Sequence, residues 1–237
     1  MDTSQRMALI QQVGEEILTL DELKALLDSK KHPIAYDGFE PSGNLHIAQG
    51  LLRTINLNKM LNAGCHFKMW VADWFAWMNN KYDGDLDKIK IAGEYFIETW
   101  KACGLEADNV KFLWASDVVN DAAYWSKVVQ IGRHSTLQRV LRTTQIMGRS
   151  EKDGLSAAQI FYPCMQAADI FHLDADICQL GMDQRKVNIL ARELGPKLFN
   201  RKPVAVHHHM LMGLQQPPAP QGAGDTVERA IAMKMSK

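Results

Sequence analysis

Short, mostly apolar runs alternate along this chain with longer stretches in which apolar residues recur at helical spacing. Runs of the first kind are typical of strands, and stretches of the second kind are typical of helices that bury one face. The runs predict strands at 33–36, 65–72, 110–114, 176–180 and 204–207. The stretches predict helices at 7–18, 45–62, 86–102, 122–147, 157–171 and 183–194. This alternation predicts an α/β fold with a parallel sheet and helices on both of its faces.

Single residues mark the expected helix ends. Thr19 or Asp21 can cap a further helix that ends at Leu27, and Gly64 stands where the helix 45–62 should stop. Pro163 lies inside the stretch 157–171, where it either kinks the helix or starts it.

The composition is that of an ordinary folded protein, since 46% of the 237 residues are hydrophobic and 23% are charged. The length suits one large domain or two small ones. Lys+Arg and Asp+Glu both number 27, so any contact with nucleic acid must come from a local basic patch. No apolar run reaches membrane length, and the acidic N-terminus suits neither a signal nor a transit peptide. We therefore expect a soluble cytoplasmic protein that does not bind a membrane.

The composition changes after Leu214. Residues 215–224 are rich in Gln, Pro, Ala and Gly, so we expect a mobile surface loop at 215–233. The sequence then ends at Lys234-Met235-Ser236-Lys237, inside this polar region. We therefore suspect that it is a fragment of a longer protein.

Two segments combine a strand, glycines and the start of a helix. The segment 36–43 runs into the helix that follows His46, and Leu180-Gly181-Met182-Asp183-Gln184 runs into another helix. Glycines let a ligand approach the backbone, and a helix N-terminus attracts anions, so either segment could hold a phosphate or ribose. Each by itself is more simply an ordinary turn between strand and helix. Neither a dinucleotide fingerprint nor a P-loop motif is present.

Four segments together resemble one family. Pro41–Gly50 resembles the HIGH signature of class I aminoacyl-tRNA synthetases, with Gln49 in place of the second histidine, and Lys234–Lys237 matches KMSKS without its last serine. The segments 162–169 and 181–186, like 36–43, are similar to tyrosyl-tRNA synthetases of the eukaryotic and archaeal branch. The segments span nearly the whole chain in the family's order.

The resemblance implies a Rossmann-like nucleotide-binding fold with an inserted helical connective region at about 116–155. We expect an N-terminal helical segment at 1–32 and a catalytic domain at 33–237, and the family's anticodon-binding domain would be absent. In the family, the insertion forms a dimer interface and lies near the tRNA acceptor end. A homodimer or pseudo-dimer is therefore expected. Basic residues give this region its character, although a solvated helix face is an equal alternative: Arg133, Arg139, Arg142 and Arg149.

The implied reaction joins tyrosine to ATP and then transfers tyrosine to tRNA(Tyr). The tyrosine carboxylate is already a nucleophile, so catalysis should be positioning plus stabilisation of phosphate charge. His46 and Gln49 lie three residues apart and can both donate hydrogen bonds to phosphate oxygens. Lys234 and Lys237 would hold the pyrophosphate end, although a solvated basic tail is the simpler alternative. His46 alone would be read as a surface histidine.

Tyrosine recognition rests on a helix face. Tyr162, Gln166 and Asp169 fall at i, i+4 and i+7. By resemblance, Asp169 and Tyr36 would bind the phenol hydroxyl, while Tyr162, Gln166 and Gln184 would bind the ammonium group. Apolar neighbours of Asp169 predict that it is buried and needs a partner. A site built for a phenol rejects phenylalanine, and this family is the standard example of that discrimination.

The remaining substrate, ATP with Mg²⁺, would lie against residues of several segments. These are Gly38, Ser42, His46, Gly181, Asp183, Met210 and Leu211. The aromatic residues Trp70, Trp74, Phe75 and Trp77 are expected to form core and pocket wall. His207-His208-His209 cannot converge on one ion, because adjacent strand residues face opposite ways, and no cysteines form a C-x-x-C pair, so we expect no protein-bound metal.

Two other functions stay open. A tryptophanyl-tRNA synthetase would share the fold and signatures, but Asp169 and Tyr36 argue against it because an indole offers no hydroxyl. A non-catalytic, synthetase-like module that binds tRNA or a partner, or one half of a double-length synthetase, would explain Gln49. Retention of the signature lysines Lys234 and Lys237 argues against loss of activity.

Overall fold

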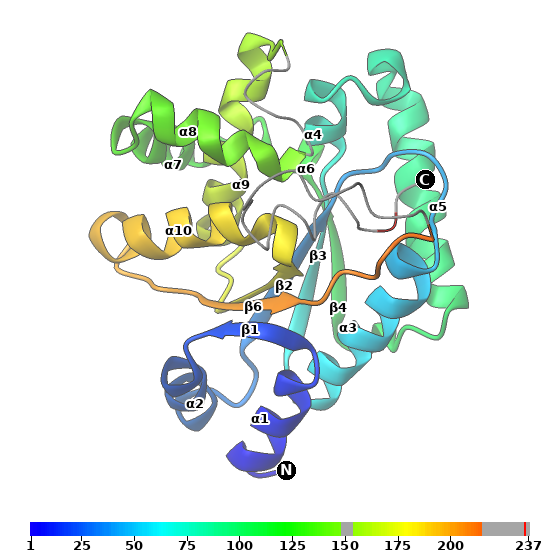
Figure 1. The fold of residues 1–237 in the computed structure, drawn as a ribbon, viewed down its shortest axis with the longest axis vertical. Helices are drawn as coiled ribbons and strands as arrows, with labels where there is room; N and C mark the ends of the chain where they lie inside the picture. Colours follow the sequence, from blue (N-terminus) through cyan, green and yellow to red (C-terminus); the bar gives the residue numbers. More distant parts are fainter. Residues whose placement is uncertain (148–153, 215–234, 236–237) are drawn as a thin grey trace.

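The computed structural model describes residues 1–147, 154–214 and 235 of the chain. Within them, a six-stranded sheet forms the centre of the molecule (Figure 1). The strands are β1 (Gly14–Leu18), β2 (Ile34–Phe39), β3 (His66–Val71), β4 (Val110–Trp114), β5 (Ile177–Gly181) and β6 (Val204–His208). The α-helices are α1 (Thr3–Gln11), α2 (Leu20–Ser29), α3 (Arg53–Asn62), α4 (Asp73–Met78), α5 (Leu86–Ala102), α6 (Ala115–Val118), α7 (Ala122–Arg133), α8 (Leu137–Thr143), α9 (Ala157–His172) and α10 (Arg185–Leu198).

The strand order is β1-β6-β5-β2-β3-β4. Strands β2 to β6 are parallel to one another, and the edge strand β1 pairs antiparallel with β6. The chain moves from β2 towards β4 in one direction and then returns to add β5 and β6 on the other side of β2. The order therefore reverses between β2 and β5, where open α/β sheets bind ligands. The predicted α/β class, with a mostly parallel sheet, is confirmed.

Apolar side chains fill a core on each face of the sheet. Phe67, Met69 and Val71 of β3 pack with α1, α3 and α5 on one face, whereas Trp70 packs on the other with α7, α9 and α10. This alternation follows from the two-residue period of a strand. Figure 1 shows α7 to α10 together on one side of the sheet and α3 and α5 on the other. In the described part of the chain, no helix is both long and apolar enough to cross a membrane.

The N-terminal segment differs from its prediction. A single helix was expected over 7–18, but α1 begins at Thr3, capped by Asp2, and ends at Gln11. Gly14–Leu18 is instead an edge strand, with Ile17 paired to Val206. Pairing with β6 therefore overrides the helical spacing of the sequence, as tertiary context often does. The segment 1–32 is not wholly helical.

Two predicted helices are interrupted. The stretch 122–147 was expected to be one helix, but it divides into α7, α8 and the 3₁₀ turn η4 (Thr144–Met147). Thr136 caps α8 by accepting a hydrogen bond from the Arg139 N–H, because a threonine oxygen can satisfy a free helical donor. The stretch 45–62 begins later than expected, with a π-helical turn η1 (Ala48–Leu52) that leads into α3.

The other elements agree with their predictions to within a few residues. Of the two candidate caps of α2, Thr19 and Asp21, Thr19 is the cap, because its side chain accepts a hydrogen bond from the Glu22 N–H at 3.2 Å. Pro163 does not start its helix, because α9 begins at Ala157 under the cap of Ser156 and continues past the proline. The short helix α4 was not predicted, and its aromatic residues gave no helical period.

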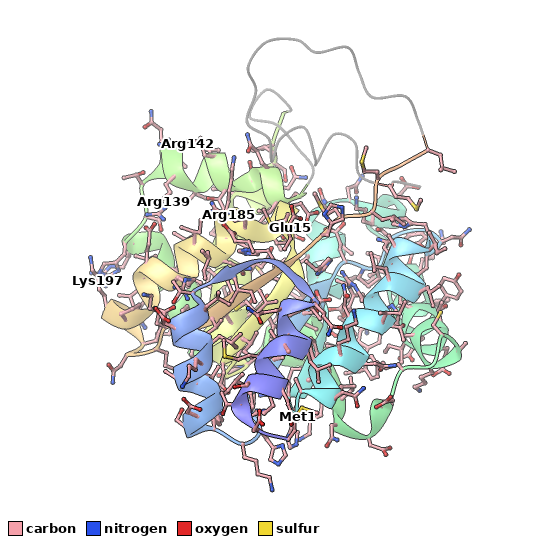
Figure 2. The ribbon with its side chains drawn as sticks, turned by 60° about the horizontal axis from the view of Figure 1, so that its bottom comes forward. Met1, Glu15, Arg139, Arg142, Arg185 and Lys197 are labelled. Atoms are coloured by element: carbon pink, nitrogen blue, oxygen red, sulfur yellow. The ribbon has the colours of Figure 1, made fainter. Side chains whose placement is uncertain are left out.

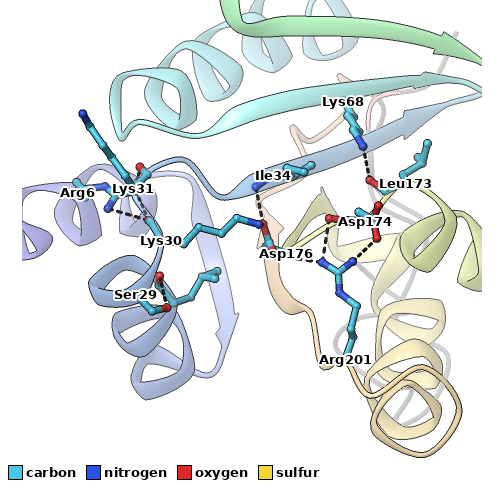
Figure 3. Close-up of polar contacts among 11 residues, drawn as sticks. Arg6, Ser29, Lys30, Lys31, Ile34, Lys68, Leu173, Asp174, Asp176 and Arg201 are labelled. Atoms are coloured by element: carbon cyan, nitrogen blue, oxygen red, sulfur yellow. Dashed lines mark hydrogen bonds and ion pairs between the residues drawn. The ribbon is translucent and has the colours of Figure 1, made fainter.

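Partly and fully buried charged side chains at the amino ends of the strands have several polar partners (Figure 3). Asp176, which precedes β5, accepts from Lys30 Nζ at 2.6 Å, from the Ile34 N–H at 2.7 Å and from Arg201 Nη2 at 3.1 Å. Arg6 of α1 donates to the carbonyl of Ala63 at 2.7 Å and to other carbonyls that end α2. These contacts fasten α1, α2 and the α10–β6 connection to the sheet.

Candidate active site

A cavity of about 280 Å³ lies at the carboxyl ends of β2 and β5, where the strand order reverses. It is lined by every predicted site residue that falls in the described part of the chain. These are Tyr36, Gly38, Ser42, His46, Gln49, Tyr162, Gln166, Asp169, Gly181, Asp183, Gln184, Met210 and Leu211. The structure thus brings together segments far apart in sequence, and the binding role of each residue stays a prediction.

Asp169 stands at one end of the cavity, almost wholly buried on α9. Its Oδ1 accepts a hydrogen bond from the Tyr124 hydroxyl at 2.9 Å, whereas Oδ2 has no hydrogen bond within the described residues. Burial raises the pKa of this carboxyl well above its usual range, against the stabilising effect of Tyr124 and the nearby Trp70 indole. The Trp70 N–H does not reach hydrogen-bonding geometry. A buried acceptor with one unused oxygen suits a ligand that brings a hydroxyl donor.

Tyr36 of β2 faces the same end of the cavity. Burial, and next the charge of Asp169, raise the pKa of the Tyr36 phenol well above 10, so the hydroxyl keeps its proton. A Cβ at residue 38 would lie 2.7 Å from the Tyr36 hydroxyl oxygen, so Gly38 is needed for this close approach. Strand β2 therefore places the neutral hydroxyl of Tyr36 close to the carboxyl of Asp169, which has one oxygen without a hydrogen bond among the described residues.

The middle of the cavity is lined by amides and a tyrosine from α9. Gln166 Nε2 donates to Gln184 Oε1 at 3.0 Å, and Gln184 Nε2 donates to the Ile146 carbonyl at 3.0 Å. The Tyr162 hydroxyl donates to Glu40 Oε2 at 3.1 Å. Tyr162 and Gln166 each donate to a neighbouring side chain and each keep an oxygen that can accept from a cationic ligand group.

Glu40 is the charge closest to these oxygens. Burial raises its pKa, while Lys81, Asn79 and Tyr162 act in the opposite direction. Asn79 Nδ2 donates to both carboxylate oxygens, at 3.3 and 3.2 Å, and Lys81 Nζ lies 3.3 Å from Oε1. This network fixes the Tyr162 hydroxyl with its proton directed to Glu40.

The opposite end of the cavity is formed by the HIGH-like segment and by β5. His46 precedes η1 and Gln49 lies within it, and the Gln49 carbonyl accepts from the Trp100 indole at 2.7 Å. At Gly181, a Cβ would lie 2.5 Å from Asp183 Oδ1, so a side chain at residue 181 would displace this carboxylate. His208 completes this end, with Nδ1 2.6 Å from Gln179 Nε2, and burial followed by Arg53 lowers its pKa to about 4. The imidazole is neutral near pH 7.

The family comparisons agree with this geometry. A family described as "tRNA synthetases class I (W and Y)" matches residues 28–217. The Arabidopsis thaliana protein "Tyrosine--tRNA ligase 1, cytoplasmic" is 58% identical over 218 residues, which are 91% of this chain and 57% of that relative. The chain belongs to the tyrosyl-tRNA synthetase family of class I.

Solved tyrosyl-tRNA synthetases have the same fold. The Pyrococcus horikoshii enzyme complexed with L-tyrosine superposes with a TM-score of 0.91 at 35% identity, over 100% of this chain and 69% of that one. The Leishmania major enzyme in complex with tyrosinol gives 0.88 at 50% identity, over 95% of this chain and 34% of that one. The chain spans little more than half the length of the Arabidopsis synthetase.

The predicted lysines and the predicted aromatic run have mixed outcomes. Lys234 and Lys237 lie outside the described residues, as does Arg149, while Met235 lines the cavity and donates its N–H to the Leu211 carbonyl at 2.7 Å. Of the aromatic run, Trp70 and Phe75 are buried as expected. Trp77 is 42% exposed, because it lies on the outer side of α4, so its placement in the core was wrong.

The three consecutive histidines point to different partners. His207 Nδ1 lies 2.8 Å from Glu16, whereas His208 faces Gln179 and His209 lies 3.0 Å from Glu15. Within the described ranges, no cluster of three or more His, Cys, Asp or Glu side chains could hold a metal ion. The four cysteines are free thiols.

Tyr124, Glu40 and Arg53 were missed as residues of this site. Tyr124 carries no local signal, because its partner Asp169 is 45 residues away and only the α7–α9 packing joins them. Glu40 lies inside the quoted segment 36–43, so a charged residue in a ligand-binding turn was a usable signal. Arg53 lies one helical turn after Gln49, and that spacing could have placed it on the same face.

The predicted basic region of the family's insertion is partly exposed. Arg133 and Arg142 are exposed, whereas Arg139 Nη2 pairs with Glu193 at 2.5 Å. Figure 2 shows Arg139 and Arg142 on the outer part of α8, well separated from Met1. Val129 and Leu137 are also exposed there, at 56% and 63%.

Proposed function

We propose that this protein activates tyrosine with ATP to form tyrosyl-adenylate and transfers the tyrosyl group to tRNA(Tyr). The observation that carries the proposal is the unused Oδ2 of buried Asp169, at the end of a cavity that joins the two substrate-binding segments. A hydroxyl at the tip of an amino-acid side chain is the ligand group that such an acceptor selects. The names of the Arabidopsis, Pyrococcus and Leishmania relatives support the same substrate.

Tyrosine would enter with its phenol towards Asp169 and Tyr36. Its hydroxyl would donate to Asp169 Oδ2 and accept from the Tyr36 hydroxyl, which keeps its proton. Phenylalanine would leave both groups buried without a partner, and that loss discriminates against it. A tryptophan indole carries no hydroxyl, so the alternative tryptophanyl activity is disfavoured by the same atoms.

The amino group of tyrosine would lie among the oxygens of Tyr162, Gln166 and Gln184. An ammonium carries three donors and no acceptor, so it needs oxygens that are not already donating towards it. The hydrogen bonds from Tyr162 to Glu40 and from Gln184 to Ile146 orient these groups accordingly. This arrangement would direct the tyrosine carboxylate towards the other end of the cavity.

ATP, as its magnesium complex, would occupy that other end, against the segment 38–49, Gly181, Asp183 and the segment 210–211. A tyrosine carboxylate oxygen would form a bond to the α-phosphorus while the bond to the bridging oxygen breaks and pyrophosphate leaves with that electron pair. No proton transfer is required. His46 and Gln49 would donate hydrogen bonds to phosphate oxygens, and on resemblance Lys234 and Lys237 would hold the pyrophosphate.

We further propose that the helical insertion forms a dimer or pseudo-dimer interface and lies near the tRNA. The exposed apolar residues Val129 and Leu137 support an interface, and exposed Arg133 and Arg142 support contact with phosphates. We propose the cytoplasm as its compartment, in keeping with the Arabidopsis relative's name.

The test is exchange of labelled pyrophosphate into ATP, with tyrosine, phenylalanine and tryptophan supplied in parallel. We expect exchange with tyrosine only. The competing function is a non-catalytic module, which Gln49 favours because it replaces a signature histidine. Tyrosine or tRNA binding without any exchange would support that module and overturn the proposed activation.

A further inference from the structure

Arg53, the first residue of α3, is a cation in the cavity wall to which the reaction above assigns no role. Its side chain is only 16% exposed and lines the cavity. It follows Gln49 by four residues, so both lie on one face of the continuous η1–α3 helix. Gln49 stands where the family signature has a histidine that can carry charge, and Arg53 brings a permanent charge one turn later.

The guanidinium of Arg53 is held from behind. Its Nε lies 3.3 Å from Oδ2 of Asp37, a fully buried carboxylate of β2. Its carbon Cζ lies 5.8 Å from the centre of the Trp100 ring. The indole N–H of Trp100 in turn donates a hydrogen bond to the Gln49 carbonyl. A buried anion and an aromatic face together restrict the rotamers of this long side chain.

Among the residues that the structure describes, the side-chain donors of Arg53 make no hydrogen bond. The Asp37 contact is an ion pair without hydrogen-bonding geometry, and both Asp37 oxygens lack a hydrogen bond among the described residues. A guanidinium has five N–H groups, but none of the described residues accepts a hydrogen bond from the terminal nitrogens of Arg53. A restrained guanidinium with free donors at a cavity wall is suited to a phosphate, whose oxygens match its planar fork.

We propose that Arg53 is a further substrate-binding residue, whose terminal nitrogens contact a phosphate of ATP. This inference rests on the proposed function, because ATP is the substrate that brings phosphates to the cavity. Arg53 thereby supplies the charge that the signature lacks at Gln49. Asp37 and Trp100 are positioning residues that keep the guanidinium at the wall.

A simpler alternative is that Arg53 only neutralises Asp37. The two explanations differ in a double variant. If Arg53 contacts phosphate, Arg53→Met weakens ATP binding, and the added Asp37→Asn change does not restore it. If Arg53 only neutralises Asp37, the double variant Arg53→Met/Asp37→Asn binds ATP as well as the unchanged protein does.

The experiment is calorimetric binding of MgATP, adenosine and tyrosine to the unchanged chain, Arg53→Met, Asp37→Asn and the double variant. We expect the Kd for MgATP to rise about 10- to 100-fold in both variants that lack Arg53, since a hydrogen bond to a charged group is lost. The Kd values for adenosine and tyrosine should change less than about threefold. Arg201→Met, which removes an ion-paired arginine at the amino end of the sheet, is the matched control and should bind MgATP normally.

Each outcome decides between the explanations. Unchanged MgATP binding in Arg53→Met, recovery in the double variant, or an equal loss of adenosine binding would overturn the phosphate contact. Failure of the unchanged chain to bind MgATP would overturn both this contact and the proposed function. MgATP binding without tyrosine-dependent pyrophosphate exchange would overturn the proposed function alone, and the Arg53 comparison would still be measured by binding.

Discussion

At the amino end of the sheet, Asp176 uses both carboxylate oxygens on Lys30, the Ile34 N–H and Arg201 (Figure 3). At the carboxyl end, Asp169 leaves one oxygen without a hydrogen bond and Asp37 leaves two, within the described residues. Asp176 is 12% exposed, whereas Asp169 and Asp37 are fully buried. Asp37 is ion-paired with Arg53, whereas Asp169 Oδ2 has no partner among the described residues. Because an unpaired buried polar group is destabilising, the free oxygen of Asp169 suits a ligand that supplies the missing partner. The contrast therefore separates Asp176, which holds elements of the fold together, from Asp169, which we propose binds the substrate.

The largest effect expected of this difference is the pH dependence due to Asp37. Burial, opposed by Arg53, raises the pKa of Asp37 from 3.8 to about 6. The Asp37 carboxyl therefore binds its proton more tightly in the folded protein than in the unfolded chain. The protonated carboxyl stabilises the folded state fully below about pH 4, and this stabilisation is lost as the pH rises through about 6. The change is about 3 kcal/mol, at about 1.36 kcal/mol per pKa unit.

Urea unfolding of the unchanged chain and of Asp37→Asn between pH 4 and 7 measures the contribution of Asp37 to the free energy of unfolding. The unfolding free energy of the unchanged chain should fall relative to that of the variant as the pH rises. A difference that stays constant over this range would mean that Asp37 is not an unfavourably buried acid.

Replacing the substrate-facing acid should affect activity and not stability. We expect Asp169→Asn to lower kcat/KM for tyrosine in pyrophosphate exchange about 100-fold, because an amide N–H can replace the free carboxyl oxygen that would receive the phenol. The unfolding free energy near pH 7 should not fall, since an amide spares the cost of burying a carboxylate. A variant that unfolds readily but exchanges normally when folded would reverse this assignment.

The reverse result is expected at the amino end. Asp176→Asn should lower the unfolding free energy by about 2 kcal/mol, less than for a fully buried pair because Lys30 and Arg201 are 42% and 31% exposed. The KM for tyrosine and for ATP in the folded fraction should be unchanged. Asp174→Asn is the matched control, because its carboxylate is 68% exposed and should contribute little.

The smallest effect concerns the residue that holds Asp169 in place. Tyr124→Phe removes the 2.9 Å hydrogen bond to Asp169 and should raise the KM for tyrosine about fivefold with little change in kcat, which corresponds to about 1 kcal/mol. Tyr95→Phe, at a tyrosine that is 45% exposed, is the control and should leave both constants unchanged. An effect on kcat alone would assign Tyr124 to the chemical step.

Much of this account could be read from local patterns. The strand–helix alternation predicted the α/β class, and the i, i+4, i+7 spacing placed Tyr162, Gln166 and Asp169 on one face of α9, where they all line the cavity. Such spacing depends only on the backbone period. The family signatures then identified the remaining segments without any knowledge of their contacts.

What was missed depends on contacts between distant parts of the chain. Gly14–Leu18 becomes a strand only because β6 is available to pair with it. Tyr124 and Arg53 acquire their roles from Asp169 and Asp37, which the fold brings beside them. Helical spacing could place Arg53 on the face of Gln49, but the partners of Tyr124 and Arg53 have no local signal and required the structure.

The most direct test of the central claim is equilibrium binding of tyrosine and phenylalanine to the unchanged chain and to Asp169→Asn. If the unused oxygen of Asp169 receives the substrate phenol, the unchanged chain should prefer tyrosine by at least about 100-fold, and the variant should lose most of that preference. Equal affinity for the two amino acids in the unchanged chain, or full preference in the variant, would contradict the assignment of this end of the sheet to tyrosine.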